Sequence, residues 1–400
     1  MSASPLGEAT LREVVEALAP IERRAGEAGE QQAAQWIAER LRGADCEAAV
    51  EAEEFLDGYA EVMRALSAAS LGAGVAALAS GPLRRLAGLA AAAVTVAIAD
   101  DVSNGPRLFR RVRAKPKTTW NVVGACGAPA DRTLVVLAHH DAAPTGAIFD
   151  PTFQAWLGET FPGLVERIDT SFPLWWALLG APLLVASGAL RGRRRQLGAG
   201  IAGSAVALAT FADIARSPIV PGANDNLAAV AVLVGLAERL RAEPIDGLRV
   251  LLASCGAEEV IQGGIYGFAR RHFPQLDRDR TWFLNLETVG SPKLVMLEGE
   301  GPVVMEDYFD RSFRDLVERA AIQAGAPLQR GLRARNSTDA VLPSRAGYPT
   351  ATLASVDRHK ALANYHLMSD TPENLDYRTV AQALVVTEAV ARELAANPWI

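Results

Sequence analysis

The chain has 400 residues, half of them apolar and 22% charged, and its mean hydropathy is slightly positive at +0.11. This length suffices for two average domains or for one large α/β domain with insertions. The 40 basic and 46 acidic residues give a formal net charge of −6, which argues against a general nucleic-acid-binding surface, so no nucleic-acid partner is expected.

The three cysteines, Cys46, Cys126 and Cys255, are an odd number at wide spacing with no C-x-x-C pair. Neither a disulfide framework nor a thiolate zinc site is therefore expected. A metal ion in this chain would have to be held by imidazole and carboxylate groups. The first 19 residues carry three glutamates and lack a basic start followed by an apolar core, so they do not predict a signal peptide.

At the N-terminal end, apolar residues recur at helical spacing over residues 11–41, with a break at 26–29. This pattern predicts two helices. Residues 47–55 then alternate between apolar and polar side chains, which predicts a strand.

Two pairs of uncharged segments follow, and each pair predicts an apolar helical hairpin. Residues 65–83 and 86–99 are separated by Arg84 and Arg85, and residues 172–190 and 196–212 flank the arginine-rich segment 191–195. A bilayer span needs about 20 apolar residues, so three of the four segments are near that length and 86–99 is short. We expect membrane association through these hairpins; the alternative is that both are buried against a soluble body.

The orientation in a membrane is left open by the charges. The arginines at the two hairpin tips favour cytoplasmic tips, whereas the basic residues within 107–117 favour the reverse. Because two hairpins return the chain to the side it left, the segments before, between and after them lie on one side. We predict a location at the cell membrane, without a side for the remaining chain.

The rest of the chain alternates between the two element types. Strand-like runs at 133–138, 248–253, 282–286 and 350–353 are separated by helical patterns at 226–240, 264–271, 306–324 and 379–395. This alternation predicts an α/β fold in which a mixed central sheet is sandwiched by helices.

Polar side chains follow these strands at the positions where open α/β sheets bind ligands. His139 and Asp141 come directly after the first strand, Glu258 and Glu259 after the second, and Glu287 after the third. At a spacing of two, His139 and Asp141 share a face of an extended chain. Asp141 could therefore hold one imidazole nitrogen and leave the other free for a metal.

Two adjacent carboxylates beside a buried strand cost several kcal/mol unless cations compensate their charge. Zinc is the simplest compensation, with one glutamate as ligand and the other free as a base. Asp225 precedes a helix and by itself would be an ordinary cap, although a carboxylate there could also bridge two cations. His366 lies in a polar loop and alone would be unremarkable.

Taken together, the motifs occur in a recognisable order: H-x-D at 139–141, G-A-N-D-N at 222–226, G-A-E-E at 256–259, N-x-E at 285–287 and Y-H at 365–366. This order resembles the dizinc co-catalytic exopeptidase (metallopeptidase) family that contains bacterial leucyl aminopeptidases and glutamate carboxypeptidase II. The resemblance covers most of the chain outside the hairpins, which lie outside the family pattern.

The resemblance implies two zinc ions per chain. Asp225 would bridge them, His139 and Glu287 would bind one, and Glu259 and His366 would bind the other. One position departs from the usual pattern: the third-strand ligand is commonly aspartate in these aminopeptidases and is Glu287 here, which leaves the occupancy of the His139 ion open.

The resemblance also implies the catalytic roles. Glu258 would be the general base, taking a proton from a metal-activated bridging water and passing it to the leaving amine, and Asp141 would orient His139. The expected protein is a zinc-dependent exopeptidase, a hydrolase of terminal peptide bonds in a peptide substrate. Aminopeptidase action is our hypothesis, and carboxypeptidase action, side-chain specificity and oligomeric state are left open.

In this interpretation the peptidase domain comprises residues 1–60, 107–171 and 215–400, and the inserted hairpins comprise 61–106 and 172–214. Alternative functions are a glutaminyl-cyclase-like enzyme with a single zinc and a catalytically inactive, receptor-like membrane relative. A cysteine nucleophile at Cys255 is disfavoured, because Glu258 and Glu259 nearby would oppose a thiolate.

Overall fold

A mixed nine-stranded sheet forms the centre of the body in the computed structural model, which describes residues 5–79 and 81–397. The strand order is β1-β2-β4-β3-β5-β9-β6-β7, with β8 paired to β6. The central strands β4, β3, β5 and β9 are parallel, and β8 is parallel to β6. The pairs β1–β2, β2–β4, β6–β9 and β6–β7 are antiparallel. The strands are β1 Glu47–Leu56, β2 Pro116–Cys126, β3 Thr133–His139, β4 Arg249–Cys255, β5 Thr281–Glu287, β6 Lys293–Glu300, β7 Glu306–Asp307, β8 Gln329–Ala334 and β9 Thr350–Val356.

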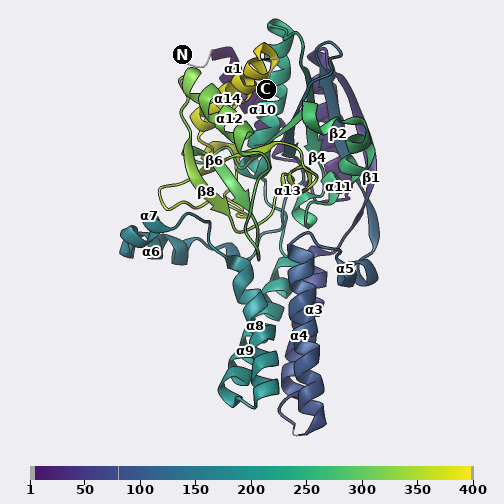
Figure 1. Cartoon of the computed structure of the whole chain (residues 1–400), viewed down its shortest axis with the longest axis vertical. Coiled ribbons are helices and arrows are strands. Elements are labelled where there is room, and N and C mark those ends of the chain that lie inside the picture. The colour runs from purple at the N-terminus through teal and green to yellow at the C-terminus, as the bar shows by residue number, and fades with distance from the viewer. Residues whose placement is uncertain (1–4, 80, 398–400) are drawn as a thin grey trace.

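Helices cover both faces of this sheet (Figure 1). Side chains of a strand alternate between its faces, so Leu134 and Val136 pack on one helical layer and Val135 and Leu137 on the other. The predicted α/β sandwich with a mixed sheet is therefore confirmed. The first layer contains α1 Pro5–Leu18, α2 Ala28–Gly43, α10 Ala228–Ala242, α12 Arg311–Gln323 and α14 Tyr377–Ala396, and the second contains α11 Gly263–His272 and α13 Val341–Arg345.

The helix predicted over residues 306–324 begins later than its pattern indicated. Residues Glu306–Asp307 form the short strand β7, and α12 begins at Arg311. The carboxylate of Asp310 accepts a hydrogen bond from the main-chain N–H of Ser312 and so caps the first turn. The amphipathic pattern alone does not show this N-terminal cap, which sets the start of the helix.

The two apolar hairpins are present and pack together as a four-helix bundle that projects from the body (Figure 1). Small residues allow the close approach of these helices. Gly200 lies against Val185, and the hydroxyl groups of Ser70 and Ser204 are 2.7 Å apart inside the bundle. The four helices are α3 Tyr59–Ala76, α4 Pro82–Val102, α8 Leu174–Arg191 and α9 Arg194–Ile214.

Three helices among the described residues are long and apolar enough to cross a membrane: α4, α8 and α9. The segment that the sequence indicated as short, residues 86–99, is the middle of α4, which extends over 21 residues from Pro82. Helix α3 is not among the three, and it carries Glu61 and Arg64 near its start. The division of the chain into a peptidase domain and insertions stays a prediction.

Three short helices lie near the junction of bundle and body. They are α5 Leu108–Arg113, after the first hairpin, and α6 Thr152–Thr160 and α7 Pro162–Arg167, before the second. In Figure 1, α6 and α7 extend sideways from the level at which the bundle joins the body.

The expectation that the cysteines form no disulfide was wrong, because Cys46 and Cys126 are bonded to each other. They are 80 residues apart in the sequence. The antiparallel pairing of β1 with β2 places Glu47 opposite Ala125, so the two cysteines meet at the ends of paired strands. Cys255 is free and buried.

Candidate metal centre

The predicted ligands come from the carboxyl ends of neighbouring strands. His139 is the last residue of β3, Glu287 is the last of β5, and the turn Glu258–Val260 follows β4. These parallel neighbours end at the same edge of the sheet. Asp225 reaches that edge from the turn Ala223–Leu227 before α10, and His366 reaches it from the loop after β9.

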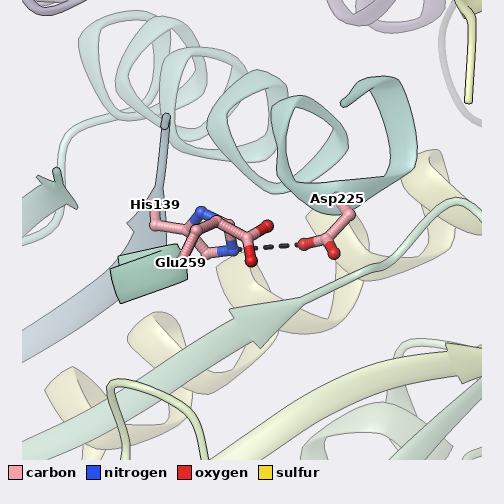
Figure 2. A group of neighbouring side chains, drawn as sticks. All are labelled: His139, Asp225 and Glu259. Carbon is pink, nitrogen blue, oxygen red and sulfur yellow. Dashed lines mark ion pairs between the residues drawn. The ribbon is translucent and has the colours of Figure 1, made fainter. Parts of the chain in front are cut away.

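The structure brings all five predicted ligands together, in two groups that share Asp225. Asp225 Oδ1 lies 3.2 Å from His139 Nε2, and the Glu287 carboxylate is 3.5 Å from the same nitrogen. Asp225 Oδ2 lies 3.3 Å from His366 Nε2, which is 3.1 Å from Glu259 Oε2. This arrangement is the one that a bridging aspartate between two cations requires. Figure 2 shows His139, Asp225 and Glu259, whose candidate ligand atoms lie within 4.8 Å of one another.

The donor set fits zinc. His139 Nε2 and His366 Nε2 are both buried, and neither forms a hydrogen bond with another described group. Each faces two carboxylates, and the surrounding pocket is lined by four carboxylates with no lysine or arginine among its described residues. Buried imidazoles and carboxylates without a compensating cation are costly, and zinc binds through these groups. The ligand assignment itself stays a prediction.

The protonation of the cluster without metal reflects burial and mutual pairing. Burial raises the pKa of Glu259 to about 7 and that of Glu287 above its ordinary range. Burial would lower the pKa of both histidines, but neighbouring carboxylates outweigh it, so the pKa of His366 rises to about 10 and that of His139 also rises. Burial would raise the pKa of Asp225, but both histidines hold it below its usual value. Bound cations would displace the protons that the glutamates and histidines of the cluster hold without metal.

Asp141 lies behind His139, where a positioning group was predicted. Its Oδ1 is 3.3 Å from His139 Nδ1, so the other imidazole nitrogen faces the carboxylates. The same carboxylate accepts hydrogen bonds at 3.0 Å from the main-chain N–H groups of Glu258 and Glu259. Asp141 therefore joins the first ligand strand to the turn that carries the predicted base.

Glu258 lies at the edge of the cluster. Its Oε2 is 3.9 Å from His139 Nε2, farther away than the Asp225 and Glu287 oxygens. Burial raises the pKa of Glu258 well above its ordinary value. The position agrees with a carboxylate that would lie close to the predicted metal ions without binding them.

Sequence reasoning missed several buried carboxylates around this cluster. The Asp370 carboxylate accepts hydrogen bonds from the main-chain N–H groups of Asn224 and Asp225, and Glu30 accepts from that of Ala257. Asp339 is almost fully buried, and burial raises its pKa to about 8. Only Asp370 had a local signal, since it follows His366 within the same polar loop. Asp339 and Glu30 are brought in by the fold.

Aromatic side chains form one side of the site. The ring of Tyr365 stacks on His366 with centroids 3.9 Å apart, and Phe149 contacts His366 edge-on at 4.5 Å. His140, by contrast, points away from the ligands, and its Nδ1 lies 2.9 Å from the Ser254 hydroxyl. The alternation of side chains along β3 thus separates the ligand from its neighbour in the sequence.

A cavity of about 80 Å³ opens beside the ligands. The body contributes the carboxylates, Tyr365 and the polar side chains of Gln262, Asn336 and Ser337. The helical bundle also contributes, because Tyr59 at the start of α3, Val102 at the end of α4 and Trp175 at the start of α8 line the same cavity.

Residues 206–391 match the family model described as peptidase family M28. This region includes Asp225, Glu258, Glu259, Glu287 and His366. No curated protein matches the chain in sequence.

Solved structures match over nearly the whole chain. A glutaminyl cyclase from Bacteroides thetaiotaomicron, bound to N-acetylhistamine, has a TM-score of 0.57 at 12% identity, over 96% of this chain and 97% of that one. A leucine aminopeptidase precursor from the same organism has a TM-score of 0.56 at 12% identity, over 96% of each chain. A Zn-dependent exopeptidase from Parabacteroides distasonis has a TM-score of 0.55 at 12% identity, over 98% of this chain and 99% of that one.

At this identity the structural likeness shows the fold alone. The family match adds the sequence evidence for the region that contains most of the ligands. Both agree with the order of the motifs and with the geometry of the cluster. Residues 206–391 of this chain are therefore similar to peptidase family M28, and the chain as a whole has the fold of solved zinc exopeptidases.

Proposed function

We propose that this protein is a zinc-dependent aminopeptidase that removes residues from the free amino end of peptides. The observation that carries the proposal is the paired cluster, in which Asp225 presents one oxygen to His139 and the other to His366. Such a cluster suits two zinc ions, and the family match supports peptide hydrolysis.

The charges around the cavity favour the amino end of a substrate. Its described lining contains four carboxylates, Asp225, Glu258, Glu259 and Glu287, and no lysine or arginine; His366 in the same lining is a predicted metal ligand. A substrate α-ammonium group can pair there with a carboxylate oxygen that the zinc ions leave free. A substrate α-carboxylate would need a lysine or arginine side chain, and no described residue of the lining supplies one.

The residues divide the reaction among them. When bound, two zinc ions would lower the pKa of a water molecule and polarise the scissile carbonyl. Glu258 accepts the proton of the attacking water and delivers it to the leaving amine. Tyr365 stays protonated, because burial raises the pKa of its phenol well above the ordinary value, so it can donate to the developing oxyanion.

A paired peptide assay tests the choice of substrate end. Zinc-verified protein should hydrolyse peptides with a free amino group, and the same peptides with an acetylated amino group should be cleaved at least about 100-fold more slowly, because the amine loses its ion pair. Initial rates are measured on matched sequences. Cleavage of only the acetylated set would refute aminopeptidase action.

Glutaminyl cyclisation is the second candidate, because a glutaminyl cyclase matches the fold as well as the aminopeptidases do. The same assay includes a peptide with N-terminal glutamine. Loss of ammonia without peptide cleavage, together with one zinc per chain, would replace the proposed function by cyclisation. Absence of both reactions would favour an inactive relative.

We also propose that the bundle anchors the protein in the cell membrane. Helices α4, α8 and α9 have the required length and hydropathy. Large apolar side chains face outward along the bundle, and exposed aromatic side chains gather on and around α6 and α7 near its junction with the body. Such aromatic side chains are typical of membrane interfaces. The outward-facing residues are Val75, Leu86, Leu89, Val96, Leu183 and Val206 on the bundle and Phe153, Trp156, Phe161 and Phe172 near the junction.

The disulfide in the body favours a body outside the cytoplasm. At the junction, Arg110 is buried in an ion pair with Asp101, and Lys117 pairs with Glu27 and Asp57. At the tip, no described carboxylate forms an ion pair with any of the arginines. The tip arginines favour a cytoplasmic tip, whereas the basic residues Arg107, Arg111, Arg113 and Lys115 near the junction favour the reverse. The disulfide in the body is typical of an oxidising compartment and supports the cytoplasmic tip. The tip arginines are Arg84, Arg85, Arg191, Arg193, Arg194 and Arg195.

Cysteine labelling in spheroplasts of cells that express the protein tests this orientation. The single substitutions Leu83→Cys at the tip and Asp131→Cys on the body both place a thiol at an exposed position. A membrane-impermeant maleimide should label the Asp131→Cys variant in intact spheroplasts and the Leu83→Cys variant only after lysis. The native cysteines provide a low background, since two are bonded and one is buried. The reverse labelling, or a protein that stays in the soluble fraction, contradicts the proposal.

A further inference from the structure

Gln262 connects the proposed catalytic base to the junction of the body with the bundle. Its side chain is nearly fully buried. Nε2 donates one hydrogen bond to Glu258 Oε1 at 2.8 Å and a second to the main-chain oxygen of Ser337 at 2.9 Å. Oε1 accepts from Asn104 Nδ2 at 2.9 Å. Both N–H groups and the oxygen of the Gln262 amide are thus hydrogen-bonded. Gln262 itself is not part of any predicted ligand motif.

The direction of these hydrogen bonds is set from the junction. The Arg107 guanidinium can only donate, and it donates to Asn104 Oδ1, which also accepts from the Tyr266 hydroxyl at 3.2 Å. Asn104 must therefore turn its Nδ2 toward Gln262, which must turn its Nε2 toward Glu258. The amide that faces the base is consequently a donor and not an acceptor.

The main chain around Gln262 is held in an unfavourable conformation. Ile261 has φ of 62° and Gln262 has φ of 56°, in the left-handed region that β-branched and bulky residues rarely adopt. Arg107 also donates to the main-chain oxygen of Ile261 at 2.7 Å, so the junction holds this turn as well as the side chain. Strained positions of this kind persist only where the surroundings over-determine them, and they cluster at functional sites.

We propose that Gln262 is a positioning residue for Glu258 and that the first hairpin controls it through Asn104. This inference rests on the proposed function, in which Glu258 is the base. By donating to Oε1, Gln262 holds the carboxylate so that Oε2 faces the metal cluster. Asn104 follows the end of α4 at Val102, so the bundle that we assign to the membrane fixes the geometry of the base. Tyr59, Val102 and Trp175 line the cavity, so the bundle is part of the catalytic centre.

Two substitutions test the relay. Gln262→Leu removes the donor at similar size, and Asn104→Asp, which is nearly isosteric, puts an acceptor beside Gln262 Oε1 and so favours a flipped amide whose oxygen faces Glu258. Each is expected to lower kcat on a free-amine peptide about 10- to 100-fold through misplacement of the base. KM and zinc content should change less than about twofold, since no ligand is touched. Steady-state kinetics and metal analysis of the full chain in detergent provide these values.

The double variant distinguishes positioning from general damage. If both residues act through one amide, Asn104→Asp adds no further loss of kcat in the Gln262→Leu background. Additive losses, or losses that follow a lower zinc content, would overturn the inference. Gln275→Leu is the matched control, because Gln275 is exposed on the same body and, among the described residues, donates a hydrogen bond only to the main-chain oxygen of Arg271.

Parallel measurement of Glu258→Gln separates this inference from the proposed function. If Glu258→Gln abolishes turnover while both relay variants keep the wild-type kcat, Gln262 does not position the base and the proposed function stands. If Glu258→Gln leaves turnover unchanged, Glu258 is not the base, and the relay fails with it.

Discussion

Replacement of Glu258 by glutamine is expected to lower kcat about 1,000-fold while zinc stays bound. A general base contributes roughly 100- to 10,000-fold to such reactions, and an amide of the same shape cannot accept the proton. Glu258 is not within the two groups of predicted ligands, so zinc content and KM should change little. The measurement is kcat on a free-amine peptide together with metal analysis of the same preparation.

Glu39→Gln is the control for this substitution, because Glu39 is an exposed glutamate on α2 and does not line the cavity. It should retain wild-type kinetics. A Glu258→Gln variant with more than half of the wild-type kcat would show that another group removes the proton. A variant that loses zinc would show that Glu258 belongs to the ligand set.

Removal of zinc is expected to destabilise the protein, and more strongly at pH 8 than at pH 5.5. Without metal, the folded-state pKa of Glu259 is about 7, above its ordinary value of 4.5, so its contribution to stability is complete below pH 4.5 and is lost as the pH rises through 7. His366, with a pKa of about 10, acts in the same direction above pH 6.5. The free energy of unfolding of the metal-free protein therefore falls as the pH rises.

Zinc reverses this trend, because it binds the deprotonated ligands and stabilises only the folded state. The difference in Tm between zinc-loaded and EDTA-treated protein should widen between pH 5.5 and pH 8, to roughly 5 °C or more. Thermal denaturation at both pH values measures it, and metal analysis should give about two zinc ions per chain.

Asp225→Asn serves as the control for the zinc effect. Asp225 faces both histidines, so its replacement should lower the zinc content and remove most of the difference in Tm. If the difference in Tm between zinc-loaded and EDTA-treated protein is the same at both pH values, the assignment of the buried carboxylates as ligands is contradicted. One zinc per chain would leave the site that contains Glu287 as the empty one.

The arrangement of the ligands followed from local patterns. Strand-like runs ended in polar residues, and parallel strands end at one edge of a sheet, so His139, Glu259 and Glu287 could be expected to meet. Side chains alternate along β3, so the sequence also predicted that His139 faces the ligands and that His140 points away from them. Hydrophobic periodicity likewise placed most helices, with an error at α12, where the Asp310 cap decides the start.

The sequence by itself determined the sheet with its helical layers, the two apolar hairpins and the residues of the cluster, because each of these has a local pattern of period or spacing. Only the tertiary structure decided which distant residues meet. The Cys46–Cys126 bond depends on the register of β1 with β2, and the contact of Asn104 with Gln262 joins positions 158 residues apart. Such hydrogen bonds and disulfides form between residues that are distant in the sequence and adjacent only in the folded chain. Local periodicity in the sequence does not predict which distant residues become adjacent.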